Sequence, residues 1–233
     1  MVTEDTPGSR DALLSKVQRH ADLLSKQSDL IEERHRAAAD ELVNWISENY
    51  QPGKPLTVIV VCSGNSRRSI LGSTMGNIAA AYYGLPEIRF YSGGTTPSAF
   101  NQRTIATLKE IGVEVEPSGE EAPRGMSEEA NPIYRVQWGT GMETVEFSKL
   151  YSDAQYPQSG FAAVMVCDQA EAECPIVKGA SKRISAPYMD PKKYDGTTIE
   201  SSKYAERRDD IGRFMLSVLS QVRSRLEMVN NSR

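Results

Sequence analysis

The sequence has few cysteines and histidines, and it lacks both a long apolar run and an excess of basic residues. Its 233 residues include three cysteines and two histidines, and the formal net charge is −4. Three cysteines are too few for the disulfide framework of a small secreted domain, and an odd number leaves one unpaired. Because no basic excess attracts nucleic acid, we expect no nucleic-acid partner.

No segment approaches the ~20 consecutive apolar residues that a membrane-spanning helix needs. The N-terminus begins Met1-Val-Thr-Glu-Asp and has no signal-peptide pattern. We therefore expect a cytoplasmic protein with no membrane partner. Hydrophobic residues make up 39% of the chain and charged residues 25%. This composition and length predict one main domain with a substantial core.

One stretch places a cysteine at the end of a buried strand. Thr57–Val61 is a continuous β-branched run, which is typical of a central parallel strand, and Cys62 follows it. From Ser69 onward, apolar residues recur at helical spacing, so residues 62–68 should form a loop that enters a helix N-terminus. Backbone amides and the positive helix end favour a bound oxyanion and a thiolate there. We expect Cys62 to be largely ionised at neutral pH and to act as a nucleophile.

The same loop supplies the groups that would bind an oxyanion. Arg68 carries a planar guanidinium that matches two oxyanion oxygens, whereas we expect the Arg67 side chain to face solvent. The predicted oxyanion-binding residues are Ser63, Gly64, Asn65, Ser66, Arg67, Arg68 and Ser69. The alternative is an inert buried cysteine at a strand end, but such a cysteine needs neither the Gly-Asn-Ser core nor the arginine that follows.

The loop sequence Cys62-Ser-Gly-Asn-Ser-Arg-Arg-Ser69 resembles the Cys-x5-Arg-Ser phosphate loop of low-molecular-weight protein tyrosine phosphatases. It also resembles the loop of thioredoxin-coupled arsenate reductases, which share that fold. The predicted order of strand, helix, strand and helix over residues 57–112 also favours a parallel α/β sheet with right-handed connections. We therefore predict an α/β fold with a doubly wound, parallel four-stranded sheet.

Two further segments are predicted outside this core. Residues 1–52 should form an N-terminal helical extension, and residues 53–233 the phosphatase-like domain. His20 and His35 lie among charged residues of the extension, so we expect both to be exposed and without a catalytic role.

An insertion is expected at about residues 117–160. It should begin as a loop and continue as a hairpin in which Ile133–Trp138 and Glu143–Phe147 flank a glycine-containing turn. The hairpin is either a lid that borders the active site with Tyr134 or Trp138, or a surface ribbon whose aromatic side chains pack on the core.

A second predicted strand, Phe161–Val166, also ends in a cysteine, Cys167. Because parallel strands present their carboxyl ends at one edge of a sheet, Cys62 and Cys167 should lie at the same crevice. Cys174 follows in a segment with helical propensity. Seven helical residues rise about 10 Å, whereas a disulfide needs Cα atoms within roughly 7 Å, so a Cys167 to Cys174 bond would require this segment to unwind. The alternative is that both cysteines are small buried hydrophobic residues.

The resemblance extends to the segments around these residues. Val166-Cys-Asp-Gln-Ala-Glu-Ala-Glu-Cys-Pro175 is similar to the cysteine-pair segment of thioredoxin-coupled arsenate reductases. This implies a relay of thiols from Cys62 through Cys167 to Cys174 and a thioredoxin-type reductant. Met189-Asp-Pro191 resembles the loop that carries the general acid of the superfamily, which implies that role for Asp190.

The function that these features predict is reduction of arsenate to arsenite. The alternative is a protein tyrosine phosphatase that uses Cys62, Arg68 and Asp190, although the paired tyrosines found after the Asp-Pro motif in many such enzymes are absent here. A second alternative is a non-catalytic module that binds an oxyanion or senses redox state. Some reductases bind potassium through an acidic residue at the position of Ser73. Because serine carries no charge, we predict no stable potassium site. We also expect no other metal and no cofactor.

Overall fold

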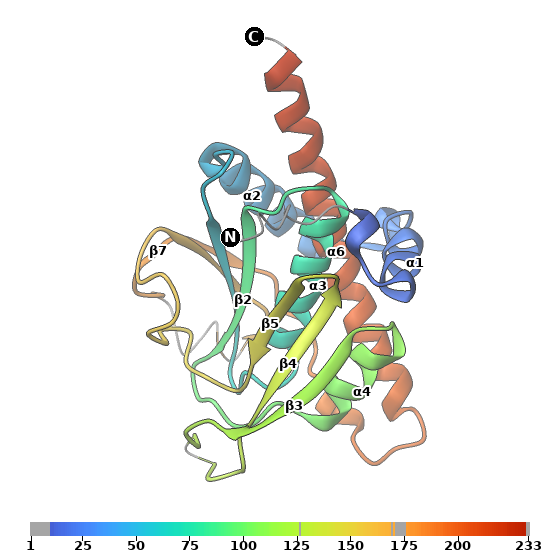
Figure 1. The fold of residues 1–233 in the computed structure, drawn as a ribbon, viewed down its shortest axis with the longest axis vertical. Coiled ribbons are helices and arrows are strands. Elements are labelled where there is room, and N and C mark those ends of the chain that lie inside the picture. Colours follow the sequence, from blue (N-terminus) through green and yellow to red (C-terminus); the bar gives the residue numbers. More distant parts are fainter. Residues whose placement is uncertain (1–9, 126, 169, 171–175, 232–233) are drawn as a thin grey trace, which may run out of the picture.

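The computed structural model, shown in Figure 1, describes residues 10–125, 127–168, 170 and 176–231. Four strands form a parallel sheet in the order β2-β1-β6-β7. In this sheet β1 (Leu56–Cys62) pairs with β2 (Ile88–Gly94) and β6 (Phe161–Met165), and β6 pairs with β7 (Ala180–Ser185). Every residue of β1 and β6 is buried, as their apolar sequences require. The predicted α/β fold with a parallel four-stranded sheet is confirmed.

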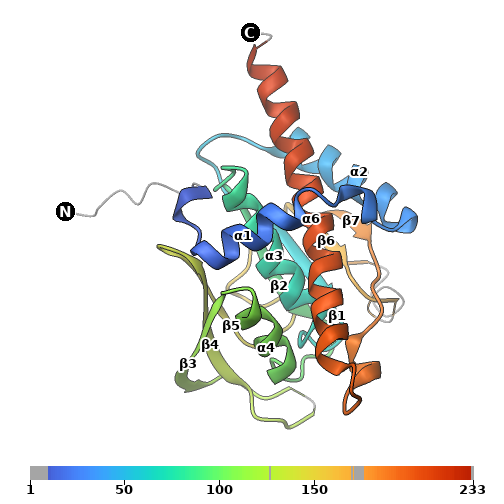
Figure 2. The ribbon, with the colours of Figure 1, turned by 90° about the vertical axis from the view of Figure 1, so that its right-hand side faces the viewer.

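A group of helices covers one face of the sheet, as Figure 2 shows. Helix α3 (Arg68–Tyr82) begins directly after the 62–67 loop and packs against β1 and β2. The long C-terminal helix α6 (Glu200–Asn231) lies against α3, and its final turns project beyond the sheet in Figure 1. None of the described helices combines the length and the apolar composition needed to cross a membrane.

The N-terminal segment forms two helices that pack on this group. A 3-10 turn (Arg10–Ala12) precedes α1 (Ser15–Leu24), and a second one (Ser28–Leu30) precedes α2 (Glu33–Asn49). Helix α1 contacts α6 and α3, while α2 contacts α6 and β7. Their buried side chains belong to the same hydrophobic cluster as the sheet. The boundary at residue 52 stays a prediction.

A second, antiparallel sheet has the order β3-β4-β5. Strands β4 (Pro132–Gly139) and β5 (Met142–Glu146) form the predicted hairpin. The prediction that the preceding stretch is a loop is wrong, because β3 (Glu114–Glu121) pairs with β4 and packs against α4 (Gln102–Glu110). Tyr134 and Trp138 are buried in the core, which agrees with the ribbon interpretation of this segment rather than with a lid.

The expectation that both histidines are exposed is also wrong. His35 is only 1% exposed, because α2 turns it toward the chain that follows β7 while its charged neighbours face solvent. Its Nε2 donates a hydrogen bond to the Pro187 carbonyl at 2.8 Å, and its ring lies 4.1 Å from the Tyr188 ring. His20 is largely covered and contacts Asp209 at 2.8 Å. Burial is the main cause that lowers the pKa of His35.

This buried histidine should make stability depend on pH. Because the folded-state pKa of His35 lies below the ordinary value of 6.5, the unfolded chain takes up the proton first. The contribution of neutral His35 is therefore complete above that pH and is lost progressively as the pH falls below it. We expect the free energy of unfolding, measured with urea at several pH values, to decline more steeply below pH 6.5 in the wild type than in His35→Gln, which keeps an N–H donor for Pro187. Equal declines would contradict this prediction.

Candidate active site

The backbone carbonyls of the 62–66 loop point away from its centre. Four of them accept hydrogen bonds from backbone N–H groups of the segment that follows β2. The donor and acceptor pairs are Thr95 and Cys62 (3.1 Å), Thr96 and Ser63 (2.9 Å), Ser98 and Gly64 (3.0 Å), and Asn101 and Ser66 (3.2 Å). In a trans peptide the N–H of the next residue points the opposite way, so the amides of residues 63, 64, 65 and 67 face the loop centre. Together with the N-terminus of α3 they form an anion-binding concavity.

A glycine allows the end of β2 to approach this loop. A Cβ atom at Gly94 would lie 2.5 Å from the Ser63 carbonyl oxygen and 2.9 Å from the Asn65 nitrogen. Any larger residue would push the loop away from the donors at residues 95–101. The loop itself contains one non-glycine residue with positive φ, Asn65 at 42°, a conformation that asparagine adopts more readily than most residues.

Cys62 lies at the base of this concavity, at the carboxyl end of β1. It is 3% exposed, and its Sγ is 3.1 Å from the hydroxyl oxygen of Ser69, in the first turn of α3. Ser69 in turn accepts a hydrogen bond from Asn65 Nδ2 at 2.9 Å. The nucleophile predicted from the sequence is thus a buried thiol whose sulfur has a hydroxyl group as its neighbour.

Arg68 and Asp190 meet at the loop. Nη1 of Arg68 donates to the Tyr188 carbonyl and Nη2 to Asp190 Oδ2, both at 2.8 Å. Arg68 Nε is buried, and no group in the described part of the chain accepts a hydrogen bond from it. It is therefore available to an oxyanion. Asp190 also caps the 3-10 turn Pro191–Tyr194 through a 3.0 Å bond from Lys192 N, so its carboxylate has both a structural contact and a place beside the loop.

The prediction that Arg67 faces solvent is wrong. Its side chain is 14% exposed, and its Nε donates to the Tyr204 hydroxyl of α6 at 2.9 Å. Asp190 and Asp195 each lie 3.9 Å from its guanidinium. Burial is the main cause that raises the pKa of Tyr204 to about 12. Its neutral hydroxyl can therefore accept from Arg67 and donate to Asp195, 2.9 Å away.

Cys167 lies beside the loop, as predicted from the shared edge of parallel strands. It is fully buried just after β6, and its Sγ is 3.5 Å from the hydroxyl oxygen of Ser63 and 3.3 Å from the Ala170 amide nitrogen. Cys174 and the predicted unwinding of the segment before it lie outside the described residues.

No cluster of three or more His, Cys, Asp or Glu side chains that could hold a metal occurs in the described ranges. The absence of bound potassium stays a prediction.

Several residues that shape the site had no signal in the sequence. Tyr188 and Tyr204 hold the two loop arginines, and Ser92, Glu146 and Lys149 reach the loop from behind. All five come from segments with no phosphate-loop pattern.

Comparison with known proteins identifies related sequences. Residues 57–130 match the family model described as low molecular weight phosphotyrosine protein phosphatase. The chain is 23% identical over 156 residues to an arsenate reductase from Shouchella clausii (strain KSM-K16), covering 66% of this chain and 88% of that protein. Both matches agree with the resemblance to this superfamily that the loop sequence showed.

Solved structures that resemble this one include a low molecular weight phosphotyrosine phosphatase from Vibrio cholerae O395 (14% identity, 70% of this chain and 94% of that chain, TM-score 0.44). Another is a thioredoxin-dependent arsenate reductase from Corynebacterium glutamicum (12% identity, 93% of this chain and 87% of that chain, TM-score 0.35).

The two loop arginines should differ in their importance for oxyanion binding. Arg68→Lys removes the free Nε and the planar fork, and charge-assisted hydrogen bonds contribute about 1.5–3 kcal/mol each. We therefore expect roughly 10- to 100-fold weaker phosphate binding by calorimetry. Arg67→Lys is the matched control and should change affinity much less, because Arg67 Nε is already bonded to Tyr204. A larger loss in Arg67→Lys than in Arg68→Lys would reverse the assignment.

Proposed function

We propose that this chain is a thiol-dependent arsenate reductase of the low-molecular-weight protein tyrosine phosphatase superfamily. The observation that carries the proposal is a second buried thiol at the phosphate loop. Cys167 Sγ lies 3.5 Å from the hydroxyl of Ser63, the residue after Cys62. Ester hydrolysis needs one cysteine, whereas reduction of arsenate by thiols needs two, because two thiols release two electrons when they are oxidised to a disulfide. The similarity to the arsenate reductase from Shouchella clausii also supports this proposal.

In the first step, the Cys62 thiolate attacks arsenic while the loop amides and Arg68 bind the arsenate oxygens. A sulfur–arsenic bond forms, and one arsenic–oxygen bond breaks. Asp190 protonates the leaving oxygen, which departs as water. The contact between Arg68 and Asp190 supports this role, because an incoming dianion competes for the guanidinium and frees the carboxyl group to face the leaving oxygen.

In the second step, Cys167 as a thiolate attacks Cys62 Sγ. The sulfur–arsenic bond breaks, its electron pair stays on arsenic, and arsenite leaves while a Cys62 to Cys167 disulfide forms. Cys174 then attacks Cys167 Sγ, which releases Cys62 as a thiolate and moves the disulfide to Cys167 and Cys174. A thioredoxin-type dithiol reduces that bond. Two cysteines are oxidised, and arsenic gains the two electrons.

A phosphatase is the second candidate, because Cys62, Arg68 and Asp190 would serve phosphoryl transfer equally well. The family match over residues 57–130 supports an enzyme of either kind. A third reading is a module that binds an oxyanion without turnover. The three differ in their need for Cys167 and Cys174, which only the reductase uses.

The relay predicts different behaviour for the two serine variants. Cys167→Ser should strand arsenic on Cys62. Cys174→Ser should complete one turnover and then trap a Cys62 to Cys167 disulfide, which thioredoxin reduces poorly because both sulfurs are buried. The measurement is arsenate-dependent oxidation of NADPH with thioredoxin and its reductase, with hydrolysis of an aryl phosphate followed in parallel.

Cys62→Ser is the control for this assay and should abolish both reactions. Wild-type protein that hydrolyses the ester but consumes no NADPH, with both serine variants equally active, would establish the phosphatase instead. If neither reaction occurs although phosphate still stabilises the protein against unfolding, the binding module is correct.

Asp190 is tested by an isosteric change. Asp190→Asn cannot donate a carboxyl proton, but its amide oxygen can still accept the cap bond from Lys192 N, so the fold should persist. We expect the single-turnover rate of the chemical step to fall by roughly 10² to 10⁴. Asp195→Asn, which alters a neighbouring carboxylate near Arg67, is the matched control and should slow this step far less. A wild-type rate in Asp190→Asn would mean that Asp190 is only a turn residue.

A further inference from the structure

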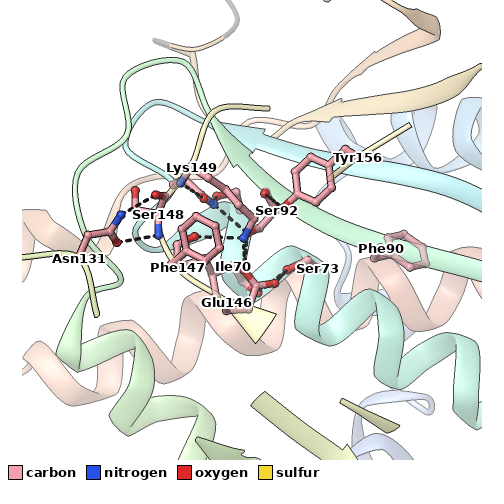
Figure 3. A network of polar contacts seen from close by, with 12 residues as sticks. Ile70, Ser73, Phe90, Ser92, Asn131, Glu146, Phe147, Ser148, Lys149 and Tyr156 are labelled. Carbon is pink, nitrogen blue, oxygen red and sulfur yellow. Dashed lines mark hydrogen bonds and ion pairs between the residues drawn. The ribbon is translucent and has the colours of Figure 1, made fainter. Parts of the chain in front are cut away.

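A buried ion pair lies behind the phosphate loop, between the last residue of β5, Glu146, and Lys149 of the segment that follows. Glu146 Oε2 and Lys149 Nζ are 3.0 Å apart, and the two side chains are only 3% and 2% exposed. Figure 3 shows these side chains among Ser73, Ser92 and Tyr156. Taking two charges out of water costs several kcal/mol per ion unless their other hydrogen-bonding groups are also satisfied. A pair in this position therefore needs a structural or functional reason.

The polar groups around the pair are almost fully matched. Lys149 Nζ also donates to the Phe147 carbonyl at 3.1 Å and lies 4.5 Å from the centre of the Phe147 ring. Glu146 Oε2 accepts a hydrogen bond from Ser92 Oγ at 2.8 Å, and its Oε1 lies 3.5 Å from Ser73 Oγ. The carboxylate oxygen Oε2 thus accepts from both the Lys149 ammonium and the Ser92 hydroxyl of β2. The other oxygen, Oε1, faces the Ser73 hydroxyl of α3, which lies 3.1 Å from the Ile70 carbonyl.

The network continues from Ser92 to the nucleophile. Asn65 Nδ2 donates to both Ser92 Oγ and Ser69 Oγ at 2.9 Å, and Ser69 Oγ is 3.1 Å from Cys62 Sγ. Asn65 Oδ1 accepts a hydrogen bond from the backbone N–H of Lys149 at 2.8 Å. Residues 146–149 are therefore connected to Asn65, the loop residue with positive φ, in two ways. Lys149 N–H binds it directly, and Glu146 binds it through Ser92.

The direction of every hydrogen bond in this chain follows from its two fixed ends. The Lys149 N–H can only donate, so Asn65 presents its oxygen there and its Nδ2 to the two serines. A carboxylate can only accept, so Ser92 gives its proton to Glu146. Ser69 already accepts from Asn65, which leaves its own proton free to point at Cys62 Sγ. The hydroxyl next to the nucleophile is thereby oriented as a donor.

The same segment makes one further hydrogen bond to the loop and one to the end of β2. Ser148 Oγ donates to the Gly64 carbonyl at 2.8 Å, and Gly94 N–H donates to the Lys149 carbonyl at 2.9 Å. Asn131 holds Ser148 in turn, through bonds of 3.0 Å to its N–H and 2.8 Å to its carbonyl (Figure 3). Residues 146–149 are thus tied both to the loop and to the strand beside it.

We infer that the Glu146–Lys149 ion pair is a positioning device that orients Ser92, Asn65 and Ser69 so that the Ser69 hydroxyl donates to the Cys62 thiolate. Neither residue touches the oxyanion. The pair acts through the loop side chains: its carboxylate makes Ser92 a donor, and the segment that it holds presents the Lys149 N–H that orients Asn65. The inference rests on the proposed role of Cys62 as the nucleophile and is independent of which oxyanion reacts.

The test measures the reactivity of Cys62 directly. Iodoacetamide alkylation of Cys62, quantified by mass spectrometry on the full chain over a range of pH, reports the thiolate without any substrate. The variant Glu146→Gln with Lys149→Met removes both charges and leaves neither partner buried alone. We expect it to fold and to bind phosphate with little change, because the loop carbonyls remain bound to residues 95–101. Alkylation at pH 7 should slow by roughly tenfold or more, and the midpoint of its pH profile should move upward.

Ser69→Ala should slow the alkylation of Cys62 by a similar factor. Combined with the double variant, it should add nothing further, because both changes remove the same hydrogen bond. Lys203→Met with Glu206→Gln is the matched control: it removes an exposed Lys–Glu pair of the same i,i+3 spacing and should leave alkylation unchanged. If the double variant fails to fold, Ser92→Ala breaks the chain between Glu146 and Asn65 without disturbing the ion pair and should reproduce the effect.

An unchanged alkylation profile in the folded double variant, or in Ser92→Ala, would overturn the inference, as would fully additive losses with Ser69→Ala. Failure of the reductase proposal is distinguishable, because it would appear as a lack of arsenate-dependent NADPH oxidation while the alkylation results held.

Discussion

The orientation of the peptide groups between Cys62 and Arg67 is the constraint on which the rest of the site depends. Four carbonyls turn outward to N–H groups of residues 95–101, so the intervening amides converge on the loop centre. This arrangement requires β2 to end close to the loop, and Gly94 makes that approach possible. The donors are aimed before any oxyanion arrives, so binding need not reorganise the backbone.

The loop is then supported from two sides by distant segments. On the open side, the stretch after β7 holds Arg68 through the Tyr188 carbonyl and Asp190. On the buried side, residues 146–149 bind Gly64 and Asn65. The segment that contains β3, β4 and β5 is therefore more than a ribbon on the surface. Its last strand delivers an ion pair to the back of the nucleophile.

The parts of the fold that the sequence predicted are those with local or topological causes. The β-branched run before Cys62 specifies a buried strand by itself, and the edge shared by parallel strands places Cys167 near Cys62. Strand β3 escaped prediction because its residues are mostly exposed and glutamate-rich, and it is held by pairing with β4 and by packing against α4, which its sequence does not show. Burial of His35 depends on how α2 is rotated against residues 187 and 188, which its charged neighbours do not reveal.

Two features of the site could not be predicted from the sequence, because each depends on tertiary packing. Arg67 lies against Tyr204, which is 137 positions away in the chain, so no local pattern could show that contact. Glu146 and Lys149 have the spacing of an ordinary surface pair, but in the fold both are buried, and the Phe147 and Tyr156 rings lie beside Lys149 Nζ. A sequence pattern states which charges are neighbours, but tertiary packing decides whether they are solvated.

The bond between Arg67 and Tyr204 also has a consequence for the order in which this protein matures. Contacts between residues far apart in the chain form only after the intervening segments have closed on one another. The reactive thiol at position 62 is translated well before Tyr204, which lies on α6. A nascent chain therefore carries Cys62 before Tyr204 is available to fix the Arg67 side chain beside it.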